Sequence, residues 1–400
     1  MNKILPVFLC AVFLSFCNVK AANYTQQNIL EEIILDTEET QEIRVEENRM
    51  PEDSLNEQIS LKEKLKNVYN LNIEKYDEPR YLLEEVLKHK YSEKSKLDYT
   101  KFWGGYNGNI GVKFIENNDT GVSYNMNALN VGFDGAFKND NADFRIMLSF
   151  PQHSNRNFFD TLFADLYVAT NKVPHHRFMA GHMRAPVGKE GGSSTYTLPY
   201  FTRAQIARNF GTARKIGIRA IGEYSLVDYD IGAYSSDTYF REFFPGMEFA
   251  GWVNIKPLGK TDGKYGKLKI GGGLEAGHRG DDYCVTGAYL EYEYKKLTAN
   301  FEWANANGYN GLKGNMVNNH ASGFYTTVGY MITKKLQVLA RYDEFDPDRH
   351  KKHNNNREYT LGFNYFIKGQ ALRLILNYIF CENNIGKNSH RILIGTQILL

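Results

Sequence analysis

The sequence lacks glycine over its first 103 residues, and all 35 glycines fall from Gly104 onward. Charge divides at the same place. Residues 22–100 hold 19 acidic and 11 basic residues, whereas residues 101–400 hold 27 acidic and 35 basic residues. Because the two regions differ in both backbone freedom and charge, they predict two structural units with a boundary near residue 100.

Long apolar runs are missing after the N-terminus. Lys3, the apolar stretch 4–16 and the small-residue end at Ala21 have the form of a secretory signal peptide, and the stretch is too short to span a bilayer. We therefore expect residues 1–21 to be removed and the protein to be exported. No later segment has the roughly 20 continuous apolar residues of a spanning helix, which excludes a helical membrane protein.

Cysteine is also scarce. Cys10 and Cys17 lie in the predicted signal peptide, so only Cys284 and Cys381 remain, which excludes a disulfide-stapled secreted scaffold. These two fall on predicted strands too far apart for a disulfide, and we predict two free thiols. The sequence has no CxxC pair, no HExxH motif and no positioned Ser–His pair, so we expect no metal, no cofactor and no enzymatic activity.

Residues 22–100 leave two interpretations open. Their apolar residues follow a helical spacing, and Asp77-Glu78-Pro79 predicts the start of a helix. The apolar stripe of that helix would consist of Leu82, Leu83, Val86 and Leu87. The acidic run 36–54 instead favours a partly disordered linker. We therefore expect a short periplasmic segment that is helical or partly disordered, with a coiled-coil or trimerisation role as the alternative.

From residue 104 onward the apolar period changes to two. In LRLILNYIF (372–380), leucines and aromatic residues alternate with Arg373, Ile375 and Asn377. Sixteen segments of this kind can be placed, each roughly 10 to 14 residues long, and a transmembrane β-strand needs about 9 to 11. A half-buried sheet of a soluble protein would show the same period, so the connections must decide between the two.

The connections between these segments alternate in length. Short ones such as NDN (139–141) and KK (334–335) alternate with long polar ones such as IENNDTGVSYN (115–125) and DPDRHKKHNNN (346–356). Short turns at one end and long loops at the other are typical of an outer-membrane barrel. Two connections break the rule, GHRG (277–280) and PLGKTDG (257–263), and indicate that one strand register there is wrong.

Composition fits the same architecture. The 27 tyrosines and 25 phenylalanines are enough for aromatic girdles at both membrane interfaces. Sixteen strands enclose a water-filled lumen, whereas eight would be filled by side chains. The sequence therefore predicts an all-β, antiparallel transmembrane barrel over residues 101–400, in the outer membrane of a Gram-negative-type bacterium, with the N-terminal segment in the periplasm.

Acidic residues are missing from one long window. Between Gly191 and Gly222 there is no Asp or Glu, and residues 200–219 carry five bases. The window overlaps the longest connection, residues 185–211, and enters the strand that follows it. Guanidinium groups at a narrow, partly desolvated neck suit phosphate or carboxylate and repel cations. We expect a site for small anions here, with two alternatives: a solvated rim that binds lipopolysaccharide phosphates, and ordinary surface.

The same window carries a family resemblance. HRFMAGHMRAPVGKE (176–190) followed by YFTRAQIARNFGTARKIGIRAIGEY (200–224) resembles the phosphate-selective porin O and P family. That family has a Pro-x-Gly turn, an aromatic and Arg segment, and then Arg-x-x-Gly. The matching positions are Pro186, Gly188, Phe201, Arg203, Arg214 and Gly217. The resemblance implies a sixteen-stranded, usually trimeric channel that favours anions, with phosphate or polyphosphate as the substrates of the family.

The resemblance also implies that loop 185–211 folds into the lumen as a constriction. Arg203 and Arg208 would then lie on the loop, while Lys215 and Arg219 face the lumen from the next strand. Arg214 has the outward parity, which places it at the rim or on a bulge. The full set of candidate anion-binding residues is Arg203, Arg208, Arg214, Lys215, Arg219, Arg145 and Arg177. Lumen-facing parity is also shared by Arg341, Arg373 and Arg391, and by the acidic residues Asp134, Asp228, Asp230, Glu291 and Glu293.

These observations predict an outer-membrane porin that lets small phosphate-like or carboxylate solutes diffuse passively past a basic constriction. Its expected partners are small anions, outer-membrane lipid and lipopolysaccharide, and two further copies in a homotrimer; no nucleic acid is expected. Because the chain lacks a dense lysine cluster along the lumen approach, we expect anion preference rather than strict phosphate selectivity. The alternative is a structural or adhesive barrel anchored by its N-terminal helices.

Overall fold

The computed structural model describes residues 81–116, 120–138, 141–150, 162–237, 242–261, 263–311, 314–315, 320–384 and 386–400. The predicted signal peptide and most of the predicted periplasmic segment lie outside these residues. Among the described residues, no helix has the length and apolar character needed to cross a membrane.

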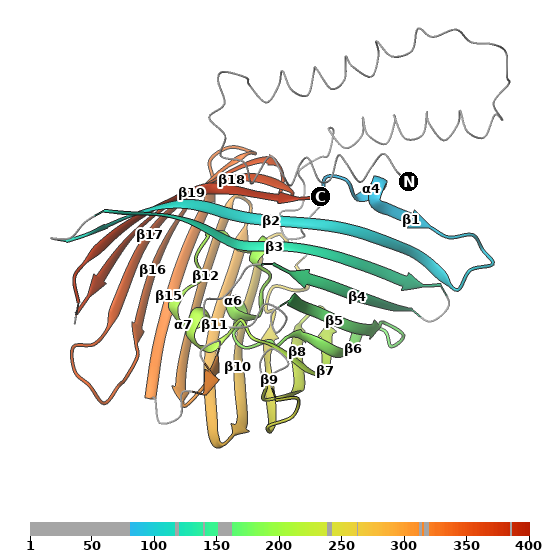
Figure 1. Cartoon of the computed structure of the whole chain (residues 1–400), viewed down its shortest axis with the longest axis horizontal. Helices are drawn as coiled ribbons and strands as arrows, with labels where there is room; N and C mark the ends of the chain where they lie inside the picture. The colour runs from blue at the N-terminus through green and yellow to red at the C-terminus, as the bar shows by residue number, and fades with distance from the viewer. Residues whose placement is uncertain are drawn as a thin grey trace, which may run out of the picture. The chain divides into compact units, whose positions relative to one another are not determined.

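Sixteen strands of the described residues form one closed antiparallel barrel (Figure 1). In chain order they are β2 (Leu97–Ile115), β3 (Gly121–Phe137), β4 (Ala142–Ser149), β5 (Phe163–Thr170), β6 (His176–Arg184), β7 (Arg214–Glu223), β8 (Val227–Ser235), β9 (Met247–Ile255), β10 (Lys267–Arg279), β11 (Asp281–Tyr294), β12 (Leu297–Asn307), β15 (His320–Met331), β16 (Leu336–Asp346), β17 (Asn356–Lys368), β18 (Leu372–Asn383) and β19 (Ser389–Leu399). Each strand pairs with its neighbours along the chain, and β19 closes the ring by pairing antiparallel with β2. Two short strands, β13 (Asn310–Gly311) and β14 (Gly314–Asn315), pair with each other as a separate small sheet.

Alternation of side chains explains why these segments form a membrane barrel. Along β17, Tyr359, Leu361 and Phe363 are exposed, while Thr360 and Asn364 between and beyond them are buried. The exposed set is apolar and aromatic and the buried set is polar, which is the inverse of a soluble sheet. Lipid therefore contacts the apolar face, and the polar face points into the barrel, as the period of two predicted.

The two ends of the barrel differ as expected. One end has short turns, such as Lys295–Lys296 between β11 and β12, and it also carries the start of β2 and the end of β19. The other end has the long loops. The two connections that seemed irregular are real features rather than errors of register, because β10 and β11 are joined through Gly280 alone and residues 256–266 link β9 to β10.

The segment before the barrel corrects one prediction. The helix expected after Pro79 is reduced to one turn, α4 (Glu84–Leu87), and is followed at once by β1 (Lys88–Lys90), which pairs with the start of β2. Pairing with an open strand edge satisfies this backbone, so sheet contacts override the helical spacing. The first barrel strand begins at Leu97 rather than at residue 101.

Strand length varies around the ring. Strands β4 to β9 have 8 to 10 residues each. Strands β10 to β12 and β15 to β19 have 11 to 14 residues. The barrel wall made by β4 to β9 is therefore shorter along the membrane normal than the wall opposite. Its strands are barely as long as a strand must be to span a bilayer.

Candidate functional site

The connection between β6 and β7, residues 185–213, lies inside the barrel, and we call it the inner loop (Figure 1). It contains the helix α6 (Lys189–Gly192), the 3-10 turn η1 (Thr195–Thr197) and the helix α7 (Gln205–Phe210). Its groups hydrogen-bond to inward-facing side chains of strands on several sides of the ring, so the loop occupies the lumen rather than the rim.

The middle of the inner loop is held by neutral side chains and by two buried arginines of the wall, Arg341 and Arg373. The Nε2 group of Gln397 on β19 donates to the carbonyl oxygen of Tyr196 at 2.9 Å, and the Tyr196 hydroxyl donates to Asn130 of β3 at 2.7 Å. The amide N–H of Phe201 donates to Asn377 of β18 at 2.9 Å. Hydrogen bonds of this kind replace the water that an irregular backbone needs and fix the loop in one position.

The helical ends of the inner loop are held by carboxylates. The amide N–H of Lys189 donates to Glu302 of β12 at 2.8 Å, and the amide N–H of Gln205 donates to Asp343 of β16 at 2.8 Å. Glu190 accepts from the amide N–H of Ala204 at 3.0 Å, which ties α6 to the start of α7. Acidic oxygens at helix N-termini satisfy the free N–H groups there and interact favourably with the helix dipole.

Apolar packing and the close approach of two glycines also fix the position of the loop. Phe210 of α7 packs against Tyr309 and Phe345 with ring centroids 4.9 and 5.7 Å apart. At the base of the loop, a Cβ on Gly211 would lie 2.8 Å from the Cα of Gly191. No larger residue fits this approach without moving backbone, so the two ends of the loop are drawn together only because both are glycine.

Arg203 is used within the loop itself. Its guanidinium is nearly buried and donates to the carbonyl oxygens of Glu190 and Ser193, the latter at 2.7 Å. Burial lowers the pKa of Arg203 to about 10, so the group remains charged at neutral pH. The prediction placed this residue on the loop, and it lies there, but its donors point at the loop backbone.

Arg208 lies on α7 and reaches the barrel wall. Its Nη2 is 3.0 Å from Glu358 of β17, and Arg391 of β19 contacts the other oxygen of the same carboxylate at 2.7 Å. The side chains of the two arginines are 30% and 23% exposed, so part of each guanidinium faces the open lumen. Two positive groups therefore share the carboxylate of Glu358, and Asp343 is a further acidic neighbour of Arg208.

Arg214 and Lys215 differ in their surroundings. Arg214 reaches Asp165 of β5 at 2.8 Å, so it is bound to the wall beside the loop and its outward parity does not make it a free rim residue. The fully buried Lys215 contacts Glu248 and lies 3.3 Å from Glu275. A lysine enclosed by two carboxylates has no access to a passing solute.

The three remaining candidates form ion pairs between strands that face the lumen. Arg145 binds Asp134 through two hydrogen bonds of 2.8 and 2.7 Å, and Arg219 binds both oxygens of Asp230. Arg177 binds Asp143 through two hydrogen bonds of 2.6 Å. The Arg145 and Arg177 side chains are 31% and 28% exposed, whereas Arg219 is 15% exposed.

The structure therefore brings the seven candidates to the inner loop and the inner wall, and gives each an oxygen partner. The base-rich window and strand parity found these cations but missed what holds them. The residues it missed are Asp143, Asp165, Glu190, Glu248, Glu275, Glu302, Asp343 and Glu358, together with the amides of Asn130, Asn377 and Gln397. Inward parity was the one sequence signal for those on strands, and it does not say which wall residue faces which part of the loop; Glu190 lies on α6 and had no such signal.

Comparison with known proteins agrees with this geometry. Residues 268–393 match the family model described as phosphate-selective porin O and P. The predicted resemblance is confirmed, and the barrel is that of an outer-membrane porin. The match covers strands β10 to β19, away from the inner loop that first suggested the family. The search among curated proteins gave no match.

Solved structures share the fold of this porin at low sequence identity. An anion-selective porin from Comamonas acidovorans superposes with a TM-score of 0.57 at 12% identity, covering 75% of this chain and 99% of that one. OprB of Pseudomonas putida gives 0.55 at 9% identity, covering 75% and 94%. The outer membrane channel DcaP of Acinetobacter baumannii gives 0.52 at 12% identity, covering 78% and 100%. Family and fold indicate a channel rather than an enzyme.

Proposed function

We propose that this porin lets small anions, phosphate-like or carboxylate, diffuse passively through a lumen narrowed by the inner loop. The observation that carries the proposal is the set of partly exposed guanidinium groups on the inner wall and on α7, namely Arg145, Arg177 and Arg208, with Arg391 sharing the carboxylate of Arg208. Support also comes from the family description and from the fold that the chain shares with an anion-selective porin.

The ion pairs set the strength of this preference. A unit charge 4 Å from an ion contributes about 1 kcal/mol in bulk water and about 4 kcal/mol at an effective dielectric of 20. A carboxylate bound to the same guanidinium cancels most of that attraction at longer range. The expected result is a modest anion preference with fast release, rather than a tight phosphate site.

A planar-bilayer measurement tests this proposal. The reversal potential under a KCl gradient should favour chloride for the wild-type protein and shift toward cations in Arg145→Ala/Arg177→Ala/Arg208→Ala. The matched control is Arg203→Ala, which removes an equally charged group whose donors bind the loop backbone and whose side chain is nearly buried. A triple variant with unchanged selectivity would contradict the role of these arginines, and a wild-type protein without conductance would favour the structural or adhesive barrel.

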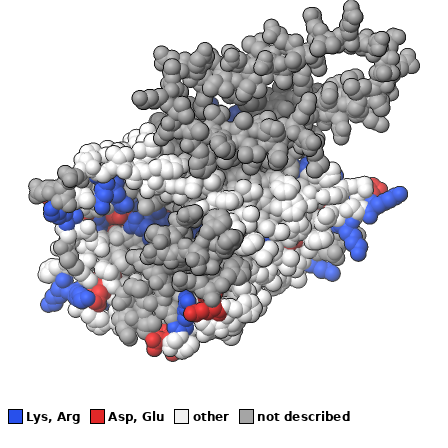
Figure 2. All heavy atoms as spheres, viewed as in Figure 1, with Lys and Arg blue, Asp and Glu red and all other residues white. Residues whose placement is uncertain are grey.

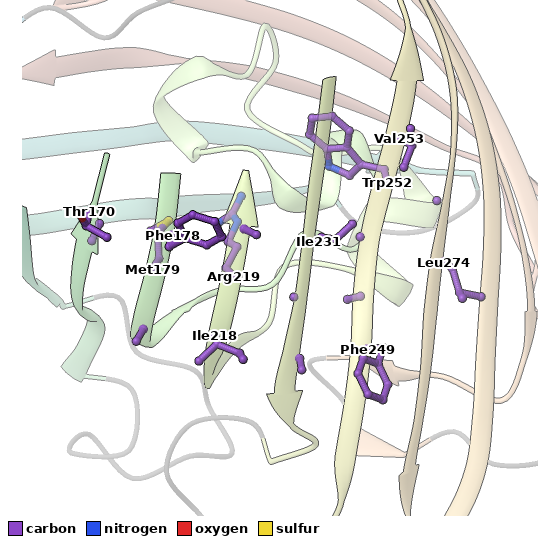
Figure 3. A pocket seen from close by; sticks show the side chains of 18 of the residues that line it. Thr170, Phe178, Met179, Ile218, Arg219, Ile231, Phe249, Trp252, Val253 and Leu274 are labelled. Atoms are coloured by element: carbon purple, nitrogen blue, oxygen red, sulfur yellow. The ribbon is translucent and has the colours of Figure 1, made fainter. Parts of the chain in front are cut away.

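We also propose that the porin forms a homotrimer through its shorter wall. The outer face of β4 to β11 has a shallow apolar groove of about 1160 Å³ (Figure 3). Large apolar side chains border it, including Ile218, Ile231 and Phe249, and small ones such as Ala220 and Ala233 form its floor. Because short strands mismatch the hydrocarbon thickness, covering this face with a second copy removes the mismatch.

The trimer proposal has its own test. Ala220→Trp/Ala233→Trp would fill the groove and should shift the purified protein from trimer to monomer in detergent, as measured by native mass spectrometry. Leu361→Trp, on the outward face of the taller β17, is the control and should leave the assembly unchanged. If the groove variant stays trimeric, the copies meet elsewhere on the barrel.

The orientation in the membrane is part of the same proposal. The described chain begins at Tyr81, and the amide N–H of Leu82 donates to the carbonyl oxygen of Leu399 at 2.8 Å, at the short-turn end. Since the short turns of such barrels face the periplasm, we expect residues 22–80 to lie on the periplasmic side. Protease added outside intact cells should leave this segment uncleaved.

A further inference from the structure

The connection between β9 and β10 is unusually long for the short-turn end and carries several lysines. Residues 256–266 link these two strands, whereas two residues link β11 to β12. The exposed lysines of the two neighbouring connections are Lys260, Lys264, Lys295 and Lys296, which we call the lysine platform. Neither the diffusion of small anions through the lumen nor the assembly of copies uses this feature.

The platform is a built structure rather than a loose loop. Its backbone makes successive turns, with hydrogen bonds from Gly259 to Lys256 at 2.9 Å and from Lys264 to Thr261 at 2.9 Å. A Cβ on Gly259 would lie 1.7 Å from the carbonyl oxygen of Ser225, so the connection packs directly on the neighbouring turn. The hydroxyl of Tyr292 donates to the carbonyl oxygen of Tyr265 at 3.0 Å and joins the connection to β11.

Two tyrosines place Lys264 and Lys295 on the outer side of the barrel. Tyr294 has the outward parity of β11, opposite to the inward-facing Glu293, and the ammonium of Lys295 lies 5.0 Å from the centre of its ring. The ammonium of Lys264 lies 5.3 Å from the ring centre of Tyr265, which is 56% exposed. Tyrosine and lysine together at the ends of membrane strands are typical of the headgroup level.

The charge of the platform is largely uncompensated among the described residues. Glu293 pairs instead with Lys267 of β10 at 3.6 Å, and both have the inward parity of their strands. Exposed apolar residues continue the surface toward the middle of the membrane, with Ile255 of β9, Ile270 of β10 and Leu290 of β11 on the outward face. A ligand that matches the whole surface has a negative head and an apolar tail.

We propose that the lysine platform binds the headgroup of an anionic phospholipid in the leaflet that meets the short-turn end. The acyl chains would contact Ile255, Ile270 and Leu290, which do not line the groove of the trimer proposal. The inference rests on the proposed placement of the barrel in the membrane. Lysines near an anionic membrane surface contribute independently of any solute in the lumen. The bound lipid would anchor the longest turn of that end and fix the height of the barrel in the bilayer.

The experiment uses the full chain reconstituted into vesicles of equal parts phosphatidylethanolamine and phosphatidylglycerol, re-extracted in neutral detergent and analysed for retained lipid by mass spectrometry. The wild-type protein should retain phosphatidylglycerol in excess. Lys260→Gln/Lys264→Gln/Lys295→Gln/Lys296→Gln should lower that excess by about tenfold or more. The matched control Lys94→Gln/Lys96→Gln/Lys172→Gln/Lys335→Gln removes the same charge from the same end and should retain the lipid.

Each outcome has one meaning. The proposal would be overturned if the wild-type protein retained no excess of phosphatidylglycerol. It would also be overturned if both quadruple variants lost the lipid equally, because non-specific attraction between lysines and anionic lipid would then explain the binding. If the platform variant does not fold, as judged by the heat-dependent gel shift, Tyr265→Ala/Tyr294→Ala keeps the charges and should still lower the excess. Conductance is measured on the same samples, so failure of the channel and failure of the lipid site are separate results.

Discussion

The positive charges of this porin fall into two populations that differ in residue type and in what holds them. Inside the barrel they are mostly arginines. Arg145 and Arg219 each bind a carboxylate on the adjacent strand, and Arg177 of β6 binds Asp143 of β4 across β5. On the described turns of the short-turn end they are lysines, exposed and with few acidic neighbours. On the face seen in Figure 2, charged side chains gather mainly toward the edges.

The difference follows from the surroundings. In a narrow lumen, a planar guanidinium can bind a carboxylate through two hydrogen bonds and still present other N–H groups to a solute. At the membrane interface, a flexible lysine reaches the headgroups while its stem lies on apolar surface. The base-rich stretch between Gly191 and Gly222 therefore does not show how much positive charge is left unpaired in the lumen, because the acidic residues that pair with it lie elsewhere in the sequence.

The largest expected effect comes from removing a carboxylate that holds the interior. Glu190→Ala removes the acceptor for Ala204 and the carboxylate 3.6 Å from the buried Arg341. Removing one partner of a buried ion pair costs about 3 to 5 kcal/mol, so the temperature of the heat-dependent gel shift should fall clearly. Lys335→Ala, at an exposed turn, should leave that temperature unchanged. If both variants lowered the gel-shift temperature equally, the interior ion pairs would stabilise the barrel no more than an exposed lysine does.

A smaller effect is expected from the base of the inner loop. Gly211→Val places a side chain against the backbone of Gly191 and should displace the loop at a cost of about 1 to 3 kcal/mol. Single-channel recordings should then show altered conductance and more noise. Gly121→Val is the control because nothing lies within 4 Å of a Cβ there. A quiet, unaltered channel in the Gly211 variant would show that the loop does not narrow the path.

The smallest effect on selectivity is expected from the rim. Because the platform lysines lie on the outer side, more than a Debye length of about 10 Å at 0.1 M salt should separate them from most of the ion path. The variant Lys260→Gln/Lys264→Gln/Lys295→Gln/Lys296→Gln should therefore keep the reversal potential of the wild-type protein. A clear shift toward cations would place these lysines at the mouth of the channel and remove the distinction between the two populations.

Much of the fold could be predicted because a membrane barrel imposes a local rule. The period of two is visible in single strands such as β17 and β18, and sixteen strands follow from counting such segments. Two free cysteines, Cys284 and Cys381, also follow from that count and are confirmed. The helix expected after Pro79 is only one turn long, because the open edge of β2 with which the chain then pairs lies outside the local window.

The site was predictable only in part, because its contacts join distant residues. Arg208 meets Glu358, and Gln205 meets Asp343, each across more than a hundred positions of sequence. Strand parity says that a side chain faces the lumen, but not which one it meets there. Arg214 illustrates this limit, since its parity points outward while its guanidinium binds Asp165.

The most direct test of the account is the reversal potential of Glu358→Gln under a KCl gradient. Glu358 is the carboxylate shared by Arg208 and Arg391, both partly exposed, and glutamine keeps its size without its charge. If paired carboxylates moderate the pull of lumen arginines, the variant should be more anion-selective than the wild-type protein. A reversal potential that is unchanged or shifted toward cations would contradict the central claim.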